Sequence, residues 1–344
     1  MMNNKTDTFD QIVGQISNIG YDLHANTLIE HAHQNLPYAQ KTIKHLPLLE
    51  GDKKKSAIVI SAGPSIHKQQ TIKKILEHKY KGTTVCVDGS YIACLKAGLI
   101  PDFVLTLDPH KTRLVRWFGD HNFEEHAEKD DYFARQDLDV DFRKNSLEHN
   151  RKNIELVNRY GHLTKAIISS SAPANVRERL IEAKFDMYWW NPLVDNPNKP
   201  ESLTRRIHSV NKWPCMNTGG NVGSAAWVFA NAVLKCSMVA LTGMDMGYYI
   251  DTPKTQTQLY YEIIHHLGTD ENIDDCFKSF EFPLTGEKFY TDPTYFWYRK
   301  NLLELLEDAT GETYNCTEGG TVFGDKIKCE YLDNFLKLVR SEED

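Results

Sequence analysis

Short apolar runs that alternate with helical stretches are the feature that most constrains the fold of this chain. Three such runs, rich in Val and Ile, occur in the first third of the sequence: SAIVIS (56–61), TTVCVD (83–88) and DFVLTLD (102–108). Each is followed by a segment whose apolar residues have helical spacing. Runs this short that alternate with helices predict a parallel β-sheet.

The same alternation continues through the rest of the chain. Further strands are predicted within residues 163–172, 184–192, 237–245 and 313–320, with helices between them. We therefore predict an α/β fold with a Rossmann-like, mostly parallel sheet and helices on both faces.

Three further regions accompany this core. Residues 1–55 are predicted to form an N-terminal helical extension, from the spacing of Phe9, Ile12, Val13, Ile16, Ile29, Ala32 and Leu36. The central domain is expected at 56–325 and a C-terminal helix at 326–344. Within the central domain, the charge-dense residues 119–160 are interpreted as a solvated insertion with weak helix, and residues 250–290 as a mobile flap with one helix at 256–267.

The composition excludes several classes of protein. Apolar residues make up 41% of the 344 positions and charged residues 25%, which is typical of a soluble globular protein. The net charge of −7 argues against a nucleic-acid partner. No apolar run approaches the ~20 residues that span a bilayer, and the N-terminus has no signal-peptide core. Seven scattered cysteines without a CxxC pair indicate reduced thiols, so a cytoplasmic location is expected.

Polar features follow several of the predicted strands. Asp88 and Asp108 end the second and third runs, and Gly243 and Asp245 end the run at 237–245. The carboxyl ends of parallel strands are where open α/β folds bind ligands. Thr218-Gly219-Gly220 precedes a helix rich in small residues, whose N–H groups we expect to be free to bind an anion.

The turn SAGPS (61–65) after the first strand is ambiguous when taken alone. It contains neither GxGxxG nor GxxxxGK[ST], so an ordinary tight turn between strand and helix is the alternative to a phosphate loop.

Five segments together resemble the MptE-like domain, over roughly residues 56–325: ISAGPSI, GLIPDFVLTLDP, NTGGNVGSAAWVFA, LTGMDM and NCTEGG. This domain occurs in motility-associated (Maf) factors, which resemble glycosyltransferases that modify flagellin with nonulosonic acids, and in archaeal 6-hydroxymethylpterin diphosphokinases. The chain is more distantly similar to bacterial sialyltransferases that use a CMP-activated sugar. In that family the turn after the first strand and the helix start hold the nucleotide.

The resemblance implies a set of site residues. Those implied to bind nucleotide are Gly63, Pro64, Ser65, Asp88, Asn217, Thr218, Gly219, Gly220 and Gly243. The candidate catalytic residues are Asp108, His110 and Asp245, of which His110 is chosen because it follows the strand-end Asp108.

The chain departs from the sialyltransferases at several of these positions. Ala62 stands where their loop has an Asn that touches the donor, and Asp88 and Asp108 stand at two positions of strand-end Asn. Two carboxylates would repel a CMP-sugar acid unless a cation lay between them. Asp88 and Asp108 are therefore candidate Mg²⁺ ligands, and the alternative is that they bind ribose hydroxyls.

The sialyltransferase base is a late-flap His, and this sequence has Lys288, Phe289 and Tyr290 near that position. His110 is the candidate base here, because a His with a pKa near neutral can take a proton from an acceptor hydroxyl. His265 and His266 in the flap are alternatives.

Three functions are compatible with these features. The favoured one is a glycosyltransferase that moves a CMP-linked nonulosonic acid onto a protein or glycan hydroxyl. The second is a diphosphokinase that uses Mg²⁺ and ATP on a pterin alcohol. The third is a non-catalytic nucleotide-binding protein of surface-glycan assembly, with the aromatic run 295–298 as its interface or, alternatively, as core. The expected partners are a sugar nucleotide and an acceptor, and homo-oligomerisation is left open.

Overall fold

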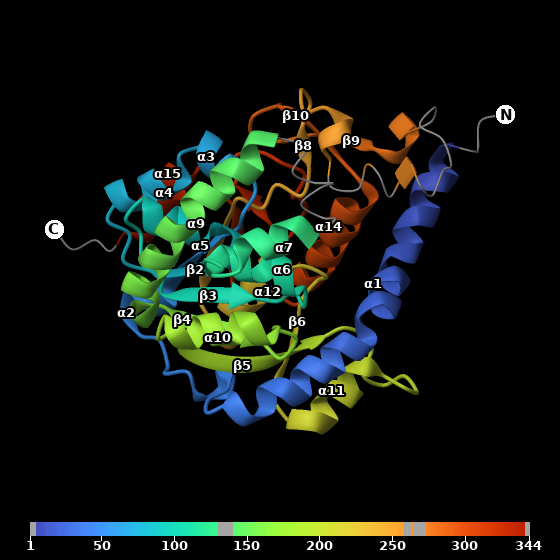
Figure 1. The fold of residues 1–344 in the computed structure, drawn as a ribbon. Helices are drawn as coiled ribbons and strands as arrows, with labels where there is room; N and C mark the ends of the chain where they lie inside the picture. Colours follow the sequence, from blue (N-terminus) through green and yellow to red (C-terminus); the bar gives the residue numbers. More distant parts are fainter. Residues whose placement is uncertain (1–4, 130–139, 258–259, 261–262, 265–272, 341–344) are drawn as a thin grey trace.

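The computed structural model describes residues 5–129, 140–257, 260, 263–264 and 273–340. The chain folds around a nine-stranded sheet in which every neighbouring pair of strands is parallel, which confirms the predicted fold class (Figure 1). The strands of this sheet are β1 (Ser56–Ile60), β2 (Thr83–Val87), β3 (Phe103–Thr106), β4 (Lys165–Ser169), β5 (Asp186–Leu193), β6 (Cys215–Asn217), β7 (Met238–Thr242), β11 (Glu312–Asn315) and β12 (Lys328–Cys329).

The order of the strands places a topological switch beside β1. The sheet runs β12-β11-β7-β1-β2-β3-β4-β5-β6. The chain therefore proceeds outward from β1 to β6 on one side, and then crosses to β7, β11 and β12 on the other side. In open α/β sheets, ligands bind outside the carboxyl ends of the strands at such a switch point.

Alternate residues of each central strand pack into two separate cores. Ile58 and Ile60 of β1 face one core, whereas Ala57 and Val59 face the other. All four side chains are fully buried. Because successive side chains of a strand point to opposite faces, a sheet covered on both sides needs apolar residues at both sets of positions. This requirement explains the uninterrupted apolar runs in the sequence.

Helices cover both faces of the sheet, as expected. One face is covered by α3 (Ser65–Lys68), α4 (Thr71–Glu77), α5 (Asp88–Lys96), α6 (Lys111–Val115), α9 (Val140–Tyr160), α10 (Ala174–Glu182) and α15 (Leu332–Val339). The other face is covered by α12 (Val222–Val228), its π-helical continuation Phe229–Val233, and α14 (Pro293–Leu306). The remaining helices are α1 (Lys5–Asn35), α2 (Gly51–Lys55), α7 (Phe123–Lys129) and α11 (Leu203–Asn211).

The N-terminal extension is helical, as predicted. α1 is 31 residues long and runs along the side of the molecule from α14 to α11 (Figure 1). Phe9 and Ala32 are buried, but Leu36 is 42% exposed because α1 ends at Asn35 and a 3₁₀ turn begins there. Leu36 is therefore not part of the buried face that the spacing suggested.

The interpretation of residues 119–160 as a region of weak helix is wrong for the described part. α9 occupies 21 residues, and its Val157 is fully buried in the same core as α5. The buried Arg179 of α10 donates to the Ile154 carbonyl (3.1 Å) and to Asn158 Oδ1 (2.7 Å), which attaches α9 to the domain. The polar composition hid the helix because, among residues 149–160 of α9, Val157 is the one buried side chain.

A small antiparallel sheet includes part of the predicted flap. Its strands, in the order β8-β10-β9, are β8 (Tyr248–Tyr249), β10 (Lys288–Thr291) and β9 (Lys278–Glu281). β8 lies just before residue 250, whereas β9 and most of β10 lie inside the flap. Most of the helix predicted at 256–267 lies outside the described residues. The terminal helix predicted from the sequence is α15, and β12 precedes it as an additional edge strand. No helix in the described part of the chain is long and apolar enough to cross a membrane.

Candidate functional site

The carboxyl edge of the sheet brings together the turns that follow β1 and β7. The Gly63 N–H donates to the Gly243 carbonyl, and the Ser61 N–H donates to the Thr242 carbonyl, each at 2.9 Å. A Cβ atom on Gly63 would overlap the Asp245 carboxylate and the Gly243 carbonyl. Glycine is therefore required at position 63 because β7 approaches so closely, and its N–H is already used within the protein. The nucleotide-binding role of Gly63, Pro64 and Gly243 stays a prediction.

Ser65 and Asp245 form a buried pair across these two turns. The Ser65 hydroxyl donates to Asp245 Oδ2 at 2.7 Å, and Asp245 is only 4% exposed. Burial raises the pKa of Asp245 to about 6, although the hydrogen bonds from Ser65 and the charge of Lys68 oppose the rise. Asp245 Oδ1 is buried and has no hydrogen-bond partner among the described residues. One oxygen of Asp245 is therefore held by Ser65 and the other is buried without a described partner, and the catalytic role of Asp245 stays a prediction.

Asp88 and Asp108 lie close enough to affect each other, as their positions at neighbouring strand ends predicted. Asp88 is 6% exposed, and its Oδ1 accepts from the Gly89 N–H at 2.7 Å. Burial, and to a smaller extent the charge of Asp108, raise the pKa of Asp88 to about 7. Asp108 Oδ1 accepts from the His110 N–H at 2.6 Å. The His110 ring, half-buried, has Nδ1 3.0 Å from the Thr112 hydroxyl.

The described residues contain no cluster of three or more His, Cys, Asp or Glu side chains that could hold a metal ion. Mg²⁺ commonly uses one or two carboxylates and completes its shell with water and substrate phosphates. The Asp88–Asp108 pair fits that donor set, so the predicted Mg²⁺ site there stays a prediction.

The turn before α12 differs from the sequence expectation. The Gly219 N–H donates to Asn217 Oδ1 and the Gly220 N–H donates to the Thr218 hydroxyl, both at 3.1 Å. The helix begins only at Val222, after Asn221 accepts from the Ser224 N–H at 2.9 Å. The N–H groups of both glycines are therefore not free, because Asn and Thr side chains bind backbone groups two residues further along such turns.

A cavity of about 790 Å³ opens at this turn, and we call it the glycine-turn cavity. Asn217, Thr218, Gly219 and Gly220 line it from one side. Leu107 and Pro109, on either side of Asp108, line it from another. The cavity therefore extends from the turn to the end of β3.

The aromatic run of α14 borders the glycine-turn cavity. The sequence did not reveal this contact. Trp297 and Tyr298 line the cavity, and a Cβ atom on Gly220 would overlap the Trp297 ring. The Asn301 side chain donates to the Gly219 carbonyl at 3.3 Å. Ile16 and Leu28 of α1 also line the cavity, so the N-terminal extension contributes to it. The spacing of aromatic residues identified a buried or interacting stripe, but not the turn against which it packs.

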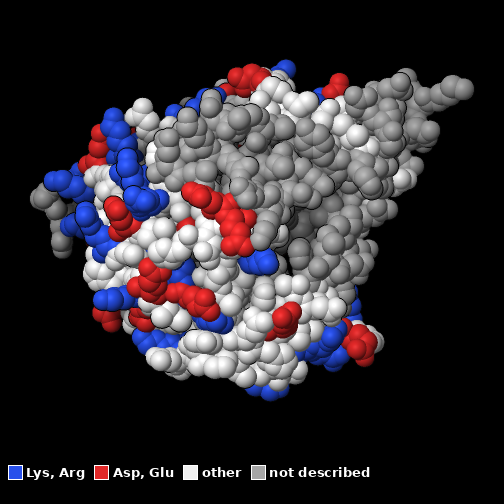
Figure 2. All heavy atoms as spheres, viewed as in Figure 1, with Lys and Arg blue, Asp and Glu red and all other residues white. Residues whose placement is uncertain are grey.

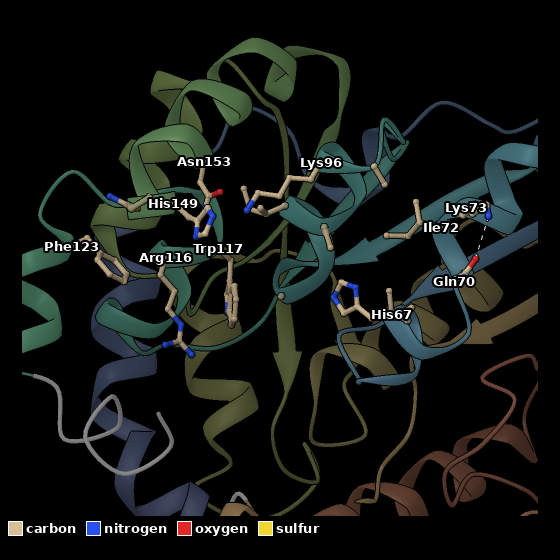
Figure 3. Close-up of a pocket in the computed structure, with 16 residues that line it drawn as sticks. His67, Gln70, Ile72, Lys73, Lys96, Arg116, Trp117, Phe123, His149 and Asn153 are labelled. Carbon is tan, nitrogen blue, oxygen red and sulfur yellow. Dashed lines mark hydrogen bonds between the residues drawn. The ribbon is translucent and has the colours of Figure 1, made fainter. Parts of the chain in front are cut away.

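A second cavity, of about 750 Å³, lies on the opposite face of the sheet, and we call it the basic cavity. Its lining comes from α3, α4, α5, the 3₁₀ turn Arg116–Phe118, α7 and α9. In the view of Figure 2, Lys and Arg side chains gather near the region that Figure 1 labels α4, α5 and α9, with acidic side chains among them. Figure 3 shows Arg116, Trp117 and His149 on one side of the cavity and His67 on the other. Sequence reasoning missed this cavity because residues 119–160 were treated as solvated.

The small sheet lies against the turn after β1. Lys68 of α3 lies 3.4 Å from the centre of the Tyr249 ring and pairs with Glu287 at 3.3 Å. Phe289 and Tyr290, which were considered near the sialyltransferase base position, are buried, and the Tyr290 hydroxyl donates to the Thr252 carbonyl at 2.6 Å. His265 and His266 lie outside the described residues.

Comparisons by sequence give one family model and one protein to which this chain is similar. Residues 30–125 match the family model described as 6-hydroxymethylpterin diphosphokinase MptE-like. This match begins in the N-terminal extension and includes the ends of β1, β2 and β3, but not the turns after β6 and β7. An uncharacterized protein of Treponema pallidum (strain Nichols) is 37% identical over 75 residues, which are 22% of this chain and 34% of that protein.

A solved structure shares the fold. The Maf glycosyltransferase from Magnetospirillum magneticum AMB-1 superposes with a TM-score of 0.54 and 14% identity. The superposition covers 90% of this chain and 38% of the Maf chain, so the present chain spans well under half of that protein. At this identity the likeness establishes the fold alone.

Proposed function

We propose, from the premise that residues 30–125 match the MptE-like family model, that this chain is a glycosyltransferase with a nucleotide-activated sugar as its donor. The proposed donor is a CMP-linked nonulosonic acid, and the acceptor is a hydroxyl of a protein or glycan. The neighbour of known structure, which is a Maf glycosyltransferase of the same fold, supports this class of reaction.

The observation that carries the proposal is the convergence at one sheet edge. The turns after β1, β2, β3, β6 and β7 all end there, and the glycine-turn cavity opens beside two of them. Its volume of about 790 Å³ lies within the usual range for small-molecule sites, roughly 300–1,000 Å³. Carboxyl groups with raised pKa values at such an edge are typical of functional sites.

In the proposed reaction, the residues of the glycine-turn cavity bind the nucleotide, whereas Asp108 and His110 act on the acceptor hydroxyl. The nucleotide occupies the glycine-turn cavity, with Asn217 and Thr218 beside it and Trp297 packed against its base. The bond between the anomeric carbon and the nucleotide phosphate breaks, and its electron pair leaves with the phosphate. The acceptor oxygen forms the new bond and gives its proton to His110, which Asp108 orients through the backbone.

Calorimetric titration with CMP, CMP-sialic acid and ATP tests the donor class. We expect CMP and CMP-sialic acid to bind and ATP not to bind. Thr218→Val keeps the shape of the side chain but removes the acceptor of the Gly220 N–H, and should weaken CMP binding about tenfold.

Thr310→Val is the matched control. It also removes a threonine hydroxyl from a turn, but it precedes β11 at the amino edge of the sheet and should leave CMP binding unchanged. Binding of ATP alone, or equal CMP affinity in Thr218→Val and the wild type, would contradict the proposal.

A diphosphokinase is the second candidate, and the positions of Asp88 and Asp108 at neighbouring strand ends favour it. Two carboxylates at one sheet edge suit a Mg²⁺–phosphate complex, burial and the charge of Asp108 raise the pKa of Asp88, and the matching family model is described by that activity. In this case Asp108→Asn should abolish Mg²⁺-dependent ATP binding, whereas Asp325→Asn at an exposed position should not. ATP binding that is independent of both Mg²⁺ and Asp108 would exclude this candidate.

A further inference from the structure

Positive side chains predominate in the lining of the basic cavity. Of its sixteen lining residues, Lys73, Lys96 and Arg116 are cationic, two are histidines (His67 and His149), and none is Asp or Glu. The whole chain has a net charge of −7, so this lining differs in sign from the rest of the protein. A concave, low-dielectric wall with one sign of charge concentrates ligands of the opposite sign.

The charges of this cavity are not all neutralised by the protein itself. Lys73 has an acidic neighbour, Glu77, at 3.8 Å. Lys96 has no ion pair among the described residues, and its pKa is lowered because the surrounding protein removes part of its hydration, although its side chain is exposed, and because Lys152 is positively charged. A bound anion would offset both effects on Lys96.

Apolar and aromatic surfaces form the walls between these cations. Ile66, Ile72 and Ile92 line the cavity together with Trp117 and Phe123. The Arg116 guanidinium lies 4.6 Å from the centre of the Trp117 ring, and Figure 3 shows both side chains at the cavity, across from His67. An aromatic face beside a guanidinium can bind a flat ring and its negative group at the same time.

The basic cavity lies next to Asp88 but does not overlap the glycine-turn cavity. Gly89, which follows Asp88, lines the basic cavity, whereas Leu107 and Pro109, which flank Asp108, line the glycine-turn cavity. A Cβ atom on Gly89 would lie 2.9 Å from the Ala62 Cβ, so the turn after β1 borders the same side. A chain neighbour of Asp88 thus lines one cavity and the chain neighbours of Asp108 line the other, and the two cavities share no lining residue.

We propose that the basic cavity is a second binding site, for a small anion with an aromatic or apolar body, such as an aryl phosphate. Its volume of about 750 Å³ accommodates a ligand of this size. The body of the ligand packs against Trp117, and its anionic group lies between Lys96 and Arg116. This site is independent of the reaction proposed for the glycine-turn cavity.

Titration calorimetry with 4-methylumbelliferyl phosphate and its uncharged parent, 4-methylumbelliferone, tests the site. We expect the phosphate to bind at least about tenfold more tightly than the parent, because the two differ only in the charged group. Lys96→Met and Arg116→Met should each weaken phosphate binding about tenfold, and added salt should weaken wild-type binding. Lys54→Met is the control, because Lys54 is exposed on α2 at the amino edge of the sheet.

Competition with CMP separates this proposal from the donor proposal. Saturating CMP should leave the affinity for the aryl phosphate within about twofold, since the two cavities share no lining residue. Lys96 is exposed, so Lys96→Met should fold normally, which circular dichroism can verify. Absence of aryl phosphate binding, equal binding by Lys96→Met and the wild type, or displacement by CMP would each overturn the proposal, whatever the outcome for CMP itself.

Discussion

Replacing Asp88 with Asn should stabilise the protein at neutral and alkaline pH. Asp88 is 6% exposed, and its pKa is raised from 3.8 to about 7, chiefly by burial. A carboxyl whose folded pKa exceeds its unfolded pKa binds its proton more tightly in the folded state. Its contribution to the free energy of unfolding is therefore fully favourable below the unfolded pKa and is lost as pH rises through about 7.

The size of this loss in the free energy of unfolding follows from the shift in the pKa of Asp88. Each pKa unit corresponds to about 1.4 kcal/mol, so ionised Asp88 lowers the free energy of unfolding by up to roughly 4 kcal/mol above pH 7. Asn carries no charge, and its Oδ1 can still accept from the Gly89 N–H. We expect Asp88→Asn to match the wild type near pH 4 and to exceed it by about 2–4 kcal/mol near pH 8.

Urea unfolding curves at pH values of about 5, 6, 7 and 8 measure this difference, provided that unfolding is two-state. The wild type should lose stability across this range, and Asp88→Asn should lose less. Asp245 contributes in the same direction in both proteins, so the difference between the two curves isolates Asp88. Asp325→Asn, at an exposed position, is the control. A constant offset between Asp88→Asn and the wild type at every pH would refute the reasoning.

Three further changes test the packing of the sheet edge. Gly63→Ala should lower the free energy of unfolding by at least about 2 kcal/mol, because the added Cβ would overlap Asp245. Gly14→Ala in α1 is the control, since nothing lies within 4 Å of its added Cβ, and it should not destabilise the protein in the same urea assay. Ser65→Ala removes the hydroxyl that donates to Asp245 and should raise the pKa of Asp245 above about 6, which carbon NMR of labelled aspartate would detect; an unchanged titration would contradict that hydrogen bond. Val157→Ala should cost about 2 kcal/mol if α9 belongs to the folded core, whereas a loss no larger than that of the exposed Lys152→Ala would show that it does not.

The strands could be located from the sequence alone because both faces of the sheet are covered, so both sets of alternating side chains in each strand must be apolar. Ile58 and Ile60 pack on one side of the sheet and Ala57 and Val59 on the other, which produces a continuous apolar run that is visible without the fold. The positions of Asp88 and Asp108 at strand ends followed from the same pattern. Their mutual influence followed from the parallel pairing of β2 with β3.

Other features depended on partners that are distant in sequence. α9 was predicted only as weak helix within a solvated insertion, because its composition is polar and, among its residues 149–160, only Val157 is buried. The N–H groups of Gly219 and Gly220 were expected to be free, yet the side chains of Asn217 and Thr218 bind them. These hydrogen bonds join residues only two positions apart, but they depend on side-chain rotamers, which cannot be predicted from residue spacing.

The sequence by itself determined the parallel α/β sheet and the residues that stand at its carboxyl edge, since apolar periodicity and chain order set both. Only the tertiary structure decided what those residues do there. Ser65 and Asp245 are 180 positions apart and become a hydrogen-bonded pair because β1 and β7 are neighbours. The basic cavity likewise exists only where helices from separate parts of the chain meet, because its charge and shape come from side chains that no local pattern links.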